Sequence, residues 1–95
     1  MHRGEVWLIN LQPTIEAEIS KTRPAVIVNK DSIGILPLKV IVPLTDWKPQ
    51  YTIRAWMIRI EPSAENGLNK TSADDTFQVR SVSETRLVIK LGKLS

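Results

Sequence analysis

The sequence predicts a mainly β protein, built as a small, strongly bent antiparallel sheet or barrel with one or more short helical turns. Two features of the 95 residues support this prediction. The apolar residues gather in five or six short runs rich in Val, Ile and Trp, which suit a pleated sheet. Clusters of Pro, Gly, Asn and Asp separate these runs, as in small all-β barrels. A barrel of this size has no room for an interior ligand, so we expect any site on its loops or outer face.

The first two strands are expected on either side of a long loop. Glu5–Asn10 has the composition of a strand, and the β-branched run Ala25–Val28 predicts a second one that starts at Pro24. The loop between them, residues 11–22, is longer than is usual in so small a domain. Loops of that length tend to be functional or disordered. Asp31–Gly34 is expected to form a turn.

The middle of the chain predicts two further strands. Leu38–Leu44 is a strand with Pro43 near its end, which lets Thr45 project from the end of the sheet. Residues 46–51 are polar and turn-like, and Trp56–Glu61 alternates as a half-buried strand does. Asn66-Gly67 indicates a turn.

The last third of the chain alternates most regularly at Thr76–Arg80. In a strand, Phe77 and Val79 would share one face there, and Gln78 and Arg80 the other. Ser81–Glu84 fits a capping box, which predicts one helical turn before a final strand at Leu87–Leu91.

Composition limits the function. The hydrophobic content of 42% suffices for one core, so residues 1–95 are expected to form a single domain. With no Cys and one His, the chain has neither thiolate metal ligands nor a histidine pair for acid–base catalysis. We therefore expect no metal and no cofactor. The net charge of +3 is compatible with a nucleic-acid partner.

The N-terminus carries no apolar signal sequence, and no apolar run reaches the length of a membrane span. These two observations predict a cytoplasmic protein without a membrane partner.

Arg23 is the first candidate for chemistry. It precedes Pro24, which biases its backbone towards an extended form at the start of a strand. Such a guanidinium is held ready for a phosphate, although a surface arginine beside a strand fits the pattern equally well. Thr45 is either a second polar group or a turn hydroxyl, and Gln78 with Arg80 is either a substrate contact or a solvated face.

This set of residues suits a reaction in which the substrate supplies its own nucleophile. Cleavage of RNA by its 2′-hydroxyl is such a reaction. Donors from Arg23, Arg80 and Thr45 would stabilise the charge that builds on the phosphate oxygens.

Four segments, in the same sequence order, resemble the MazF/PemK family of toxin endoribonucleases. They cover nearly the whole chain: Gly4–Leu8 with Pro13-Thr14, Lys21–Ala25 with its Thr-Arg-Pro, Val40–Thr45, and Gly67-Leu68 through Gln78–Val82.

The resemblance implies an SH3-like barrel (MazF/CcdB-like) and a homodimer. It implies metal-independent cleavage of single-stranded RNA that leaves a 2′,3′-cyclic phosphate and a 5′-hydroxyl. It also implies neutralisation by an acidic antitoxin. The family's C-terminal helix is expected to be short or absent here.

The resemblance also implies residue roles. Arg23 and Thr45 match the catalytic arginine and hydroxyl, and the positions assigned to RNA contact are Glu18, Lys21, Gln78 and Arg80. Two positions differ from the family's pattern: Phe77 stands where many members have an acid, and Ala17 where some have a histidine. No residue is therefore assigned as the general base. Arg23 is interpreted as a phosphate stabiliser and proton donor, because a guanidinium is a poor base.

Two other functions remain open on the sequence. One is a non-enzymatic poison of a protein such as gyrase, which shares the fold. The other is a non-catalytic RNA-binding module, which Phe77 favours.

Overall fold

The computed structural model describes residues 2–11, 22–30 and 38–94 and shows seven strands, all paired antiparallel. The predicted mainly β class is confirmed, with more strands than the five or six expected. The strands are β1 (Glu5–Asn10), β2 (Thr22–Ile27), β3 (Leu38–Asp46), β4 (Met57–Ile60), β5 (Ser72–Asp75), β6 (Arg80–Ser83) and β7 (Leu87–Lys93). Three short 3₁₀ helices lie within the described ranges: η2 (Pro49–Ile53), η3 (Thr76–Gln78) and η4 (Glu84–Arg86).

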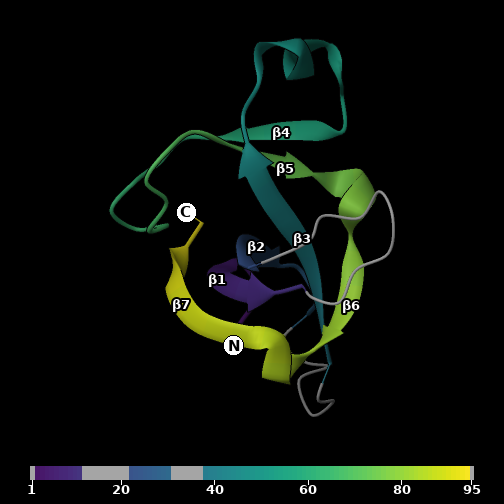
Figure 1. Cartoon of the computed structure of the whole chain (residues 1–95), viewed down its shortest axis with the longest axis vertical. Coiled ribbons are helices and arrows are strands. Elements are labelled where there is room, and N and C mark those ends of the chain that lie inside the picture. The colour runs from purple at the N-terminus through teal and green to yellow at the C-terminus, as the bar shows by residue number, and fades with distance from the viewer. Residues whose placement is uncertain (1, 12–21, 31–37, 95) are drawn as a thin grey trace.

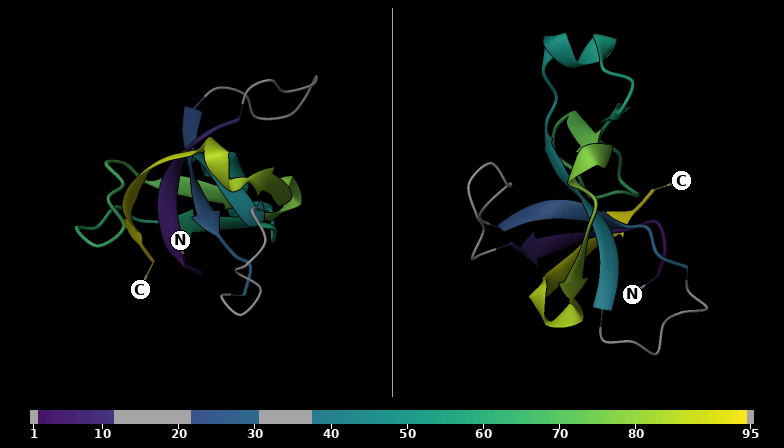
Figure 2. Two further views of the ribbon diagram at one scale, coloured as in Figure 1. Left: turned by 90° about the horizontal axis from the view of Figure 1, so that it is seen from below. Right: turned by 90° about the vertical axis from the view of Figure 1, so that its right-hand side faces the viewer.

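The sheet bends around β3, which belongs to two groups of strands (Figure 1). The N-terminal part of β3 lies between β6 and β2, and the sheet continues from β2 to β1 and β7. Its C-terminal part instead pairs with β5, which pairs with β4. Register shifts at two points between β1 and β7 bend that edge further, so that β7 curves around β1 (Figures 1 and 2).

Apolar side chains pack on both faces of β1, β2 and β3. This burial explains the continuous apolar runs in the sequence, since a strand covered on both sides has no polar face. One cluster consists of Ile9, Leu11, Ala25, Ile27, Ile41, Val82 and Leu87. The other consists of Val6, Val26, Leu44 and Leu68.

The strand predicted at Thr76–Arg80 is wrong. Ile41 of β3 pairs with Arg80, and Leu44 of β3 pairs with Asp74. These two pairs are three residues apart on β3 but six residues apart on the partner segment, so three residues of that segment cannot pair with β3. They form η3, and the Asp75 carboxylate accepts a hydrogen bond from Phe77 N at 3.1 Å to cap it. The side chain of Phe77 is 73% exposed.

Several predicted boundaries also change. β2 begins at Thr22, so Pro24 lies inside the strand; it pairs only with Leu8 of β1, and pairing with β3 starts one residue later. Pro24 has no partner on the side of β2 that faces β3, so its missing N–H removes no hydrogen bond between those two strands. Thr45 pairs with Ala73 inside β3 and does not project beyond the sheet.

The turn before β7 is confirmed, but its cap differs from the prediction. Ser83, and not Ser81, accepts the hydrogen bond from the Thr85 backbone at the start of η4. β7 then runs to Lys93, two residues beyond the predicted end.

β4 lies at the edge of the sheet and is shorter than predicted. Its Ile58 is 50% exposed, so the alternation seen in the sequence does not bury that residue in this chain. The predicted Asp31–Gly34 turn and most of the long loop lie outside the described residues.

None of the helices in the described ranges has the length and hydropathy required to cross a membrane.

Candidate active site

The candidate site lies where β2 and β3 separate. Their ladder runs from Ile27↔Ile41 to Ala25↔Pro43 and then stops. By the same register the next residues on this face would be Arg23 and Thr45. They are not paired, because β3 leaves β2 at Pro43 and joins β5 from Leu44 onwards. The change of partner therefore leaves a gap between the two residues that the sequence predicts as catalytic.

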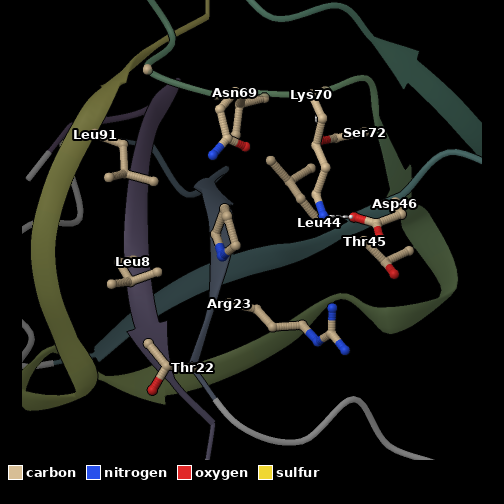
Figure 3. A pocket seen from close by; sticks show the side chains of 13 residues that line it. Leu8, Thr22, Arg23, Leu44, Thr45, Asp46, Asn69, Lys70, Ser72 and Leu91 are labelled. Carbon is tan, nitrogen blue, oxygen red and sulfur yellow. Dashed lines mark hydrogen bonds and ion pairs between the residues drawn. The ribbon is translucent and has the colours of Figure 1, made fainter.

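A cavity of about 350 Å³ opens in this gap (Figure 3). Leucines from four different segments make its apolar walls, whereas polar groups surround its other sides. The leucines are Leu8, Leu44, Leu68 and Leu91, and the polar residues are Thr22, Arg23, Thr45, Asp46, Asn69, Lys70 and Ser72. A mixed lining of this kind is typical of small-ligand and substrate sites.

Arg23 is partly buried, and its Nε has no hydrogen-bond partner among the described residues although it is shielded from solvent. A buried donor on a cation that lacks a partner is costly, and an anionic oxygen is its most favourable acceptor. Figure 3 shows the guanidinium on the same side of the cavity as Thr45. Arg23 is thus held on a strand with part of its donor capacity unused.

The carboxylate beside Thr45 is already neutralised. Asp46 Oδ1 lies 2.9 Å from Lys70 Nζ, at the edge of the cavity. This ion pair leaves Arg23 as the lining cation without a carboxylate partner among the described residues.

Gln78 and Arg80 do not join Arg23 and Thr45. They line a separate depression with Phe77, Val79 and Ser81. Arg80 pairs with Ile41 on the edge of β3 that faces away from β2. The predicted RNA contacts at Glu18 and Lys21, and the departure at Ala17, lie outside the described residues.

Asp75 is not a replacement for the acid missing at Phe77, since its carboxylate caps η3. Its neighbour Asp74 is buried opposite Leu44, and none of the residues that the structure describes forms a hydrogen bond with its Oδ1. Burial, and to a smaller extent the charge of Asp75, raises the pKa of Asp74 from 3.8 to about 6. Asp74 does not line the cavity, so its geometry gives it no contact with a substrate there.

Three polar residues that line the cavity opposite Arg23 were not predicted from the sequence. Asn69, Lys70 and Ser72 follow the predicted Asn66-Gly67 turn, and this turn was the one signal that the chain reverses near them. Within the described part of the chain, no cluster of three or more His, Asp or Glu side chains is placed to hold a metal ion.

Comparison with known proteins gives three findings. Residues 2–95 match the family described as PemK-like, MazF-like toxin of type II toxin–antitoxin system. Endoribonuclease MazF9 of Mycobacterium tuberculosis is 28% identical over 102 residues, covering 100% of this chain and 83% of that protein. Endoribonuclease PemK of Escherichia coli is 44% identical over 46 residues, or 47% of this chain and 35% of that protein.

The fold has a solved counterpart as well. The crystal structure of MazF (Form-I) from Deinococcus radiodurans superposes with a TM-score of 0.79, over 100% of this chain and 82% of that one. The sequence identity is 17%, so this likeness concerns the fold.

Proposed function

Because the chain belongs to the PemK-like, MazF-like toxin family of type II toxin–antitoxin systems, we propose that it is the toxin component and acts as an endoribonuclease on single-stranded RNA. The resemblance noted in the sequence is thereby confirmed. The observation that carries the activity is the buried Nε of Arg23, which has no hydrogen-bond partner in the described part of the chain, at a cavity shared with Thr45.

The geometry suits cleavage by transesterification. The 2′-oxygen of the RNA forms a bond to phosphorus as it loses its proton, and the bond from phosphorus to the 5′-oxygen breaks. The products are a 2′,3′-cyclic phosphate and a 5′-hydroxyl that has taken up a proton. Negative charge builds on the non-bridging oxygens in between, where hydrogen bonds from Arg23 and Thr45 stabilise it.

The endoribonuclease function is favoured over the two alternatives. Both curated relatives are named endoribonucleases, and neither name supports a gyrase poison. Among the described residues, the unpaired donor of Arg23 lies at the same cavity as the hydroxyl-bearing Thr45, as the proposed cleavage requires.

The proposal includes partners. An acidic antitoxin suits a chain of net charge +3, and the protein acts in the cytoplasm as a homodimer. Glu18, Lys21, Gln78 and Arg80 contact RNA in this proposal. Since Gln78 and Arg80 line their own depression, they bind nucleotides further from the scissile phosphate than Arg23 does.

The test is incubation of the purified chain with a long mixed-sequence RNA in EDTA, followed by mapping of the ends. We expect discrete cuts with 2′,3′-cyclic phosphate termini from the wild-type chain. Arg23→Ala should lower the rate by about 10²–10³, the usual loss for one such donor.

Arg54→Ala is the matched control, because Arg54 stacks on Tyr51 at 5.3 Å and does not line the cavity. It should cut as the wild type does. Equal cleavage rates for Arg23→Ala and the wild type would contradict the assignment of Arg23 to the active site. If the wild type binds RNA but leaves it intact, a non-catalytic RNA-binding module becomes the better function.

A further inference from the structure

The loop opposite Arg23, residues 61–71, is built around the side chain of Asn66. Asn66 is buried; its Oδ1 accepts from Ser63 N and Leu68 N, both at 3.0 Å, and its Nδ2 donates to Glu61 O at 2.9 Å. Every polar atom of this amide is therefore used inside the loop. A buried amide that forms three hydrogen bonds to the backbone of its own loop holds that loop in one conformation.

The loop is also fixed against β7 by two glycines. A Cβ on Gly67 would lie 2.0 Å from Leu91 O, and one on Gly92 would lie 2.0 Å from Glu65 O. Lys93 N donates to Glu65 O at 2.8 Å in the same contact. The loop and the strand thus touch backbone to backbone, which holds the residues after Gly67 in place.

Asn69 stands on this fixed support but takes no part in it. Its side chain is exposed at the cavity, and its amide forms no hydrogen bond with the described residues. Figure 3 shows the amide directed into the cavity, with Leu91 and Leu8 to one side and Arg23 across from it. Among the described residues, Asn69 therefore presents a free donor and a free acceptor, side by side, at a cavity with apolar walls.

We propose that Asn69 is a specificity-determining residue, which recognises the nucleobase next to the scissile phosphate by its hydrogen-bonding edge. This inference rests on the proposed function. The base lies against Leu8 and Leu91, Asn69 pairs with its edge, and Arg23 binds the adjoining phosphate.

The chemistry of the lining favours a base over a second phosphate at this position. Aliphatic walls suit the flat, apolar face of a base, whereas a phosphate in contact with leucines would lose its hydration. The nearest cation, Lys70, is already paired with Asp46 at 2.9 Å. An asparagine amide matches a base edge that offers one donor and one acceptor, and such paired contacts discriminate between bases.

The test is the cut-site profile of Asn69 variants on an RNA pool with randomised sequence. Asn69→Ala should lose the preference for one base at one position next to the cut, a change of about 10–100-fold in relative rate. Asn69→Asp should prefer a different base there, because a carboxylate only accepts hydrogen bonds. Gln50→Ala removes an exposed amide away from the cavity and should keep the wild-type profile.

An unchanged profile for both Asn69 variants overturns the inference and leaves the endoribonuclease function standing. A second measurement separates the two ideas further. The single variant Arg23→Ala and the double variant Arg23→Ala/Asn69→Ala are each bound to short RNAs that differ in one base. The ratio of affinities for the two bases gives the binding preference of each variant. If the wild type cuts no RNA but this binding preference depends on Asn69, the proposed function fails and the base site stands. If the binding preference is the same with and without Asn69, the inference that Asn69 recognises a base is overturned.

Discussion

Thr45 and Arg23 share a cavity without sharing a strand pair, and in the proposed mechanism the two side chains have different tasks at the phosphate. Arg23 would attract RNA by its charge before and during the reaction. Thr45 offers a neutral hydroxyl from a position fixed by its pairing with Ala73. A neutral donor adds little to binding in water but stabilises charge that appears only in the transition state.

Thr45→Ala should therefore slow cleavage by about 10²–10³, with RNA affinity changed by much less. Thr45→Ser keeps the hydroxyl and should retain most of the rate. Single-turnover rates and the affinity for a non-cleavable 2′-deoxy RNA analogue test this together. Equal losses of rate and affinity in Thr45→Ala would make Thr45 a binding residue.

Asp74 gives the fold a pH dependence of its own. Burial raises its folded pKa to about 6, above its ordinary value of 3.8. A group whose folded pKa is raised contributes stability that is fully present below the unfolded pKa and is lost as the pH rises through the folded pKa. The contribution of Asp74 is thus lost between about pH 4 and pH 6.

Asp74→Asn should raise the free energy of unfolding at pH 7.5 relative to the wild type, and should flatten its pH dependence in that window. Urea unfolding at pH 4.5 and pH 7.5 measures both effects. Asp46→Asn, at an exposed carboxylate, is the control and should keep the wild-type slope. If the free energy of unfolding of Asp74→Asn still falls between pH 4.5 and pH 7.5 as in the wild type, a group other than Asp74 causes the pH dependence.

At the scale of elements, local pattern predicts a strand well when its composition agrees with its pairing. β1 has the predicted bounds, Glu5–Asn10, because its composition and its pairing agree. Thr76–Gln78 has an equally good alternation but forms η3, since β3 pairs with both of its flanks in different registers. That requirement arises from a partner some 30 residues away in the sequence, and a local pattern does not contain it.

Gly67 tests the contact between the loop and β7. It has φ +70 and no space for a Cβ, whereas Gly4 has φ +89 and no atom within 4 Å of its Cβ position. Gly4→Ala should cost about 1 kcal/mol through backbone strain alone. Gly67→Ala should destabilise the fold more than Gly4→Ala, because it also forces the loop from the strand.

Thermal unfolding of the two variants gives the comparison, and RNA cleavage supplies a second readout. Gly67→Ala should also lose base preference, since it moves the support of Asn69. Equal stability of the two variants would show that the loop can move away from Leu91 at little cost, so that the close contact does not require a glycine at position 67.

For the whole molecule, the sequence predicted the half of the site that lies on strands. Arg23 and Thr45 could be named because Arg23 directly precedes Pro24 at the start of a β-branched run and Thr45 follows the apolar run that ends at Leu44. Their proximity depends on the register of β2 and β3. Asn69 lies 46 positions after Arg23 in the chain and reaches the cavity only because β7 holds its loop. Such an arrangement of distant segments is a property of the fold and leaves no local pattern.

Glu5 links β1 to its neighbour β7. Its buried carboxylate accepts from Trp7 Nε1 at 2.9 Å and His2 N at 3.0 Å, and lies 3.1 Å from Lys90 Nζ on β7. Burial alone would raise its pKa, but the hydrogen bonds from Trp7, His2 and Lys90 outweigh it and lower the pKa from 4.5 to about 2. The stability that Glu5 contributes is present above pH 4.5 and is lost as the pH falls towards 2.

Glu5→Ala should lower the free energy of unfolding at pH 7 by about 1–3 kcal/mol, because it removes a buried acceptor and leaves the half-buried Trp7 Nε1 without its partner. Chemical denaturation at pH 7 and pH 3 measures the loss, which should shrink at the lower pH. Glu84→Ala removes a carboxylate from η4 and provides the comparison. A loss of equal size in both variants would show that Glu5 does not act through this buried network.

Because β1 pairs with β7, the timing of translation bears on when this toxin becomes active. The strand that emerges first from the ribosome, β1, must wait for residues 87–93 before its second edge is covered. At about 5–20 residues per second, synthesis of the intervening chain takes several seconds. β7 also supports the loop that carries Asn69. A nascent chain in which residues 87–93 have not yet emerged therefore lacks both the second partner of β1 and the support of the loop that carries Asn69.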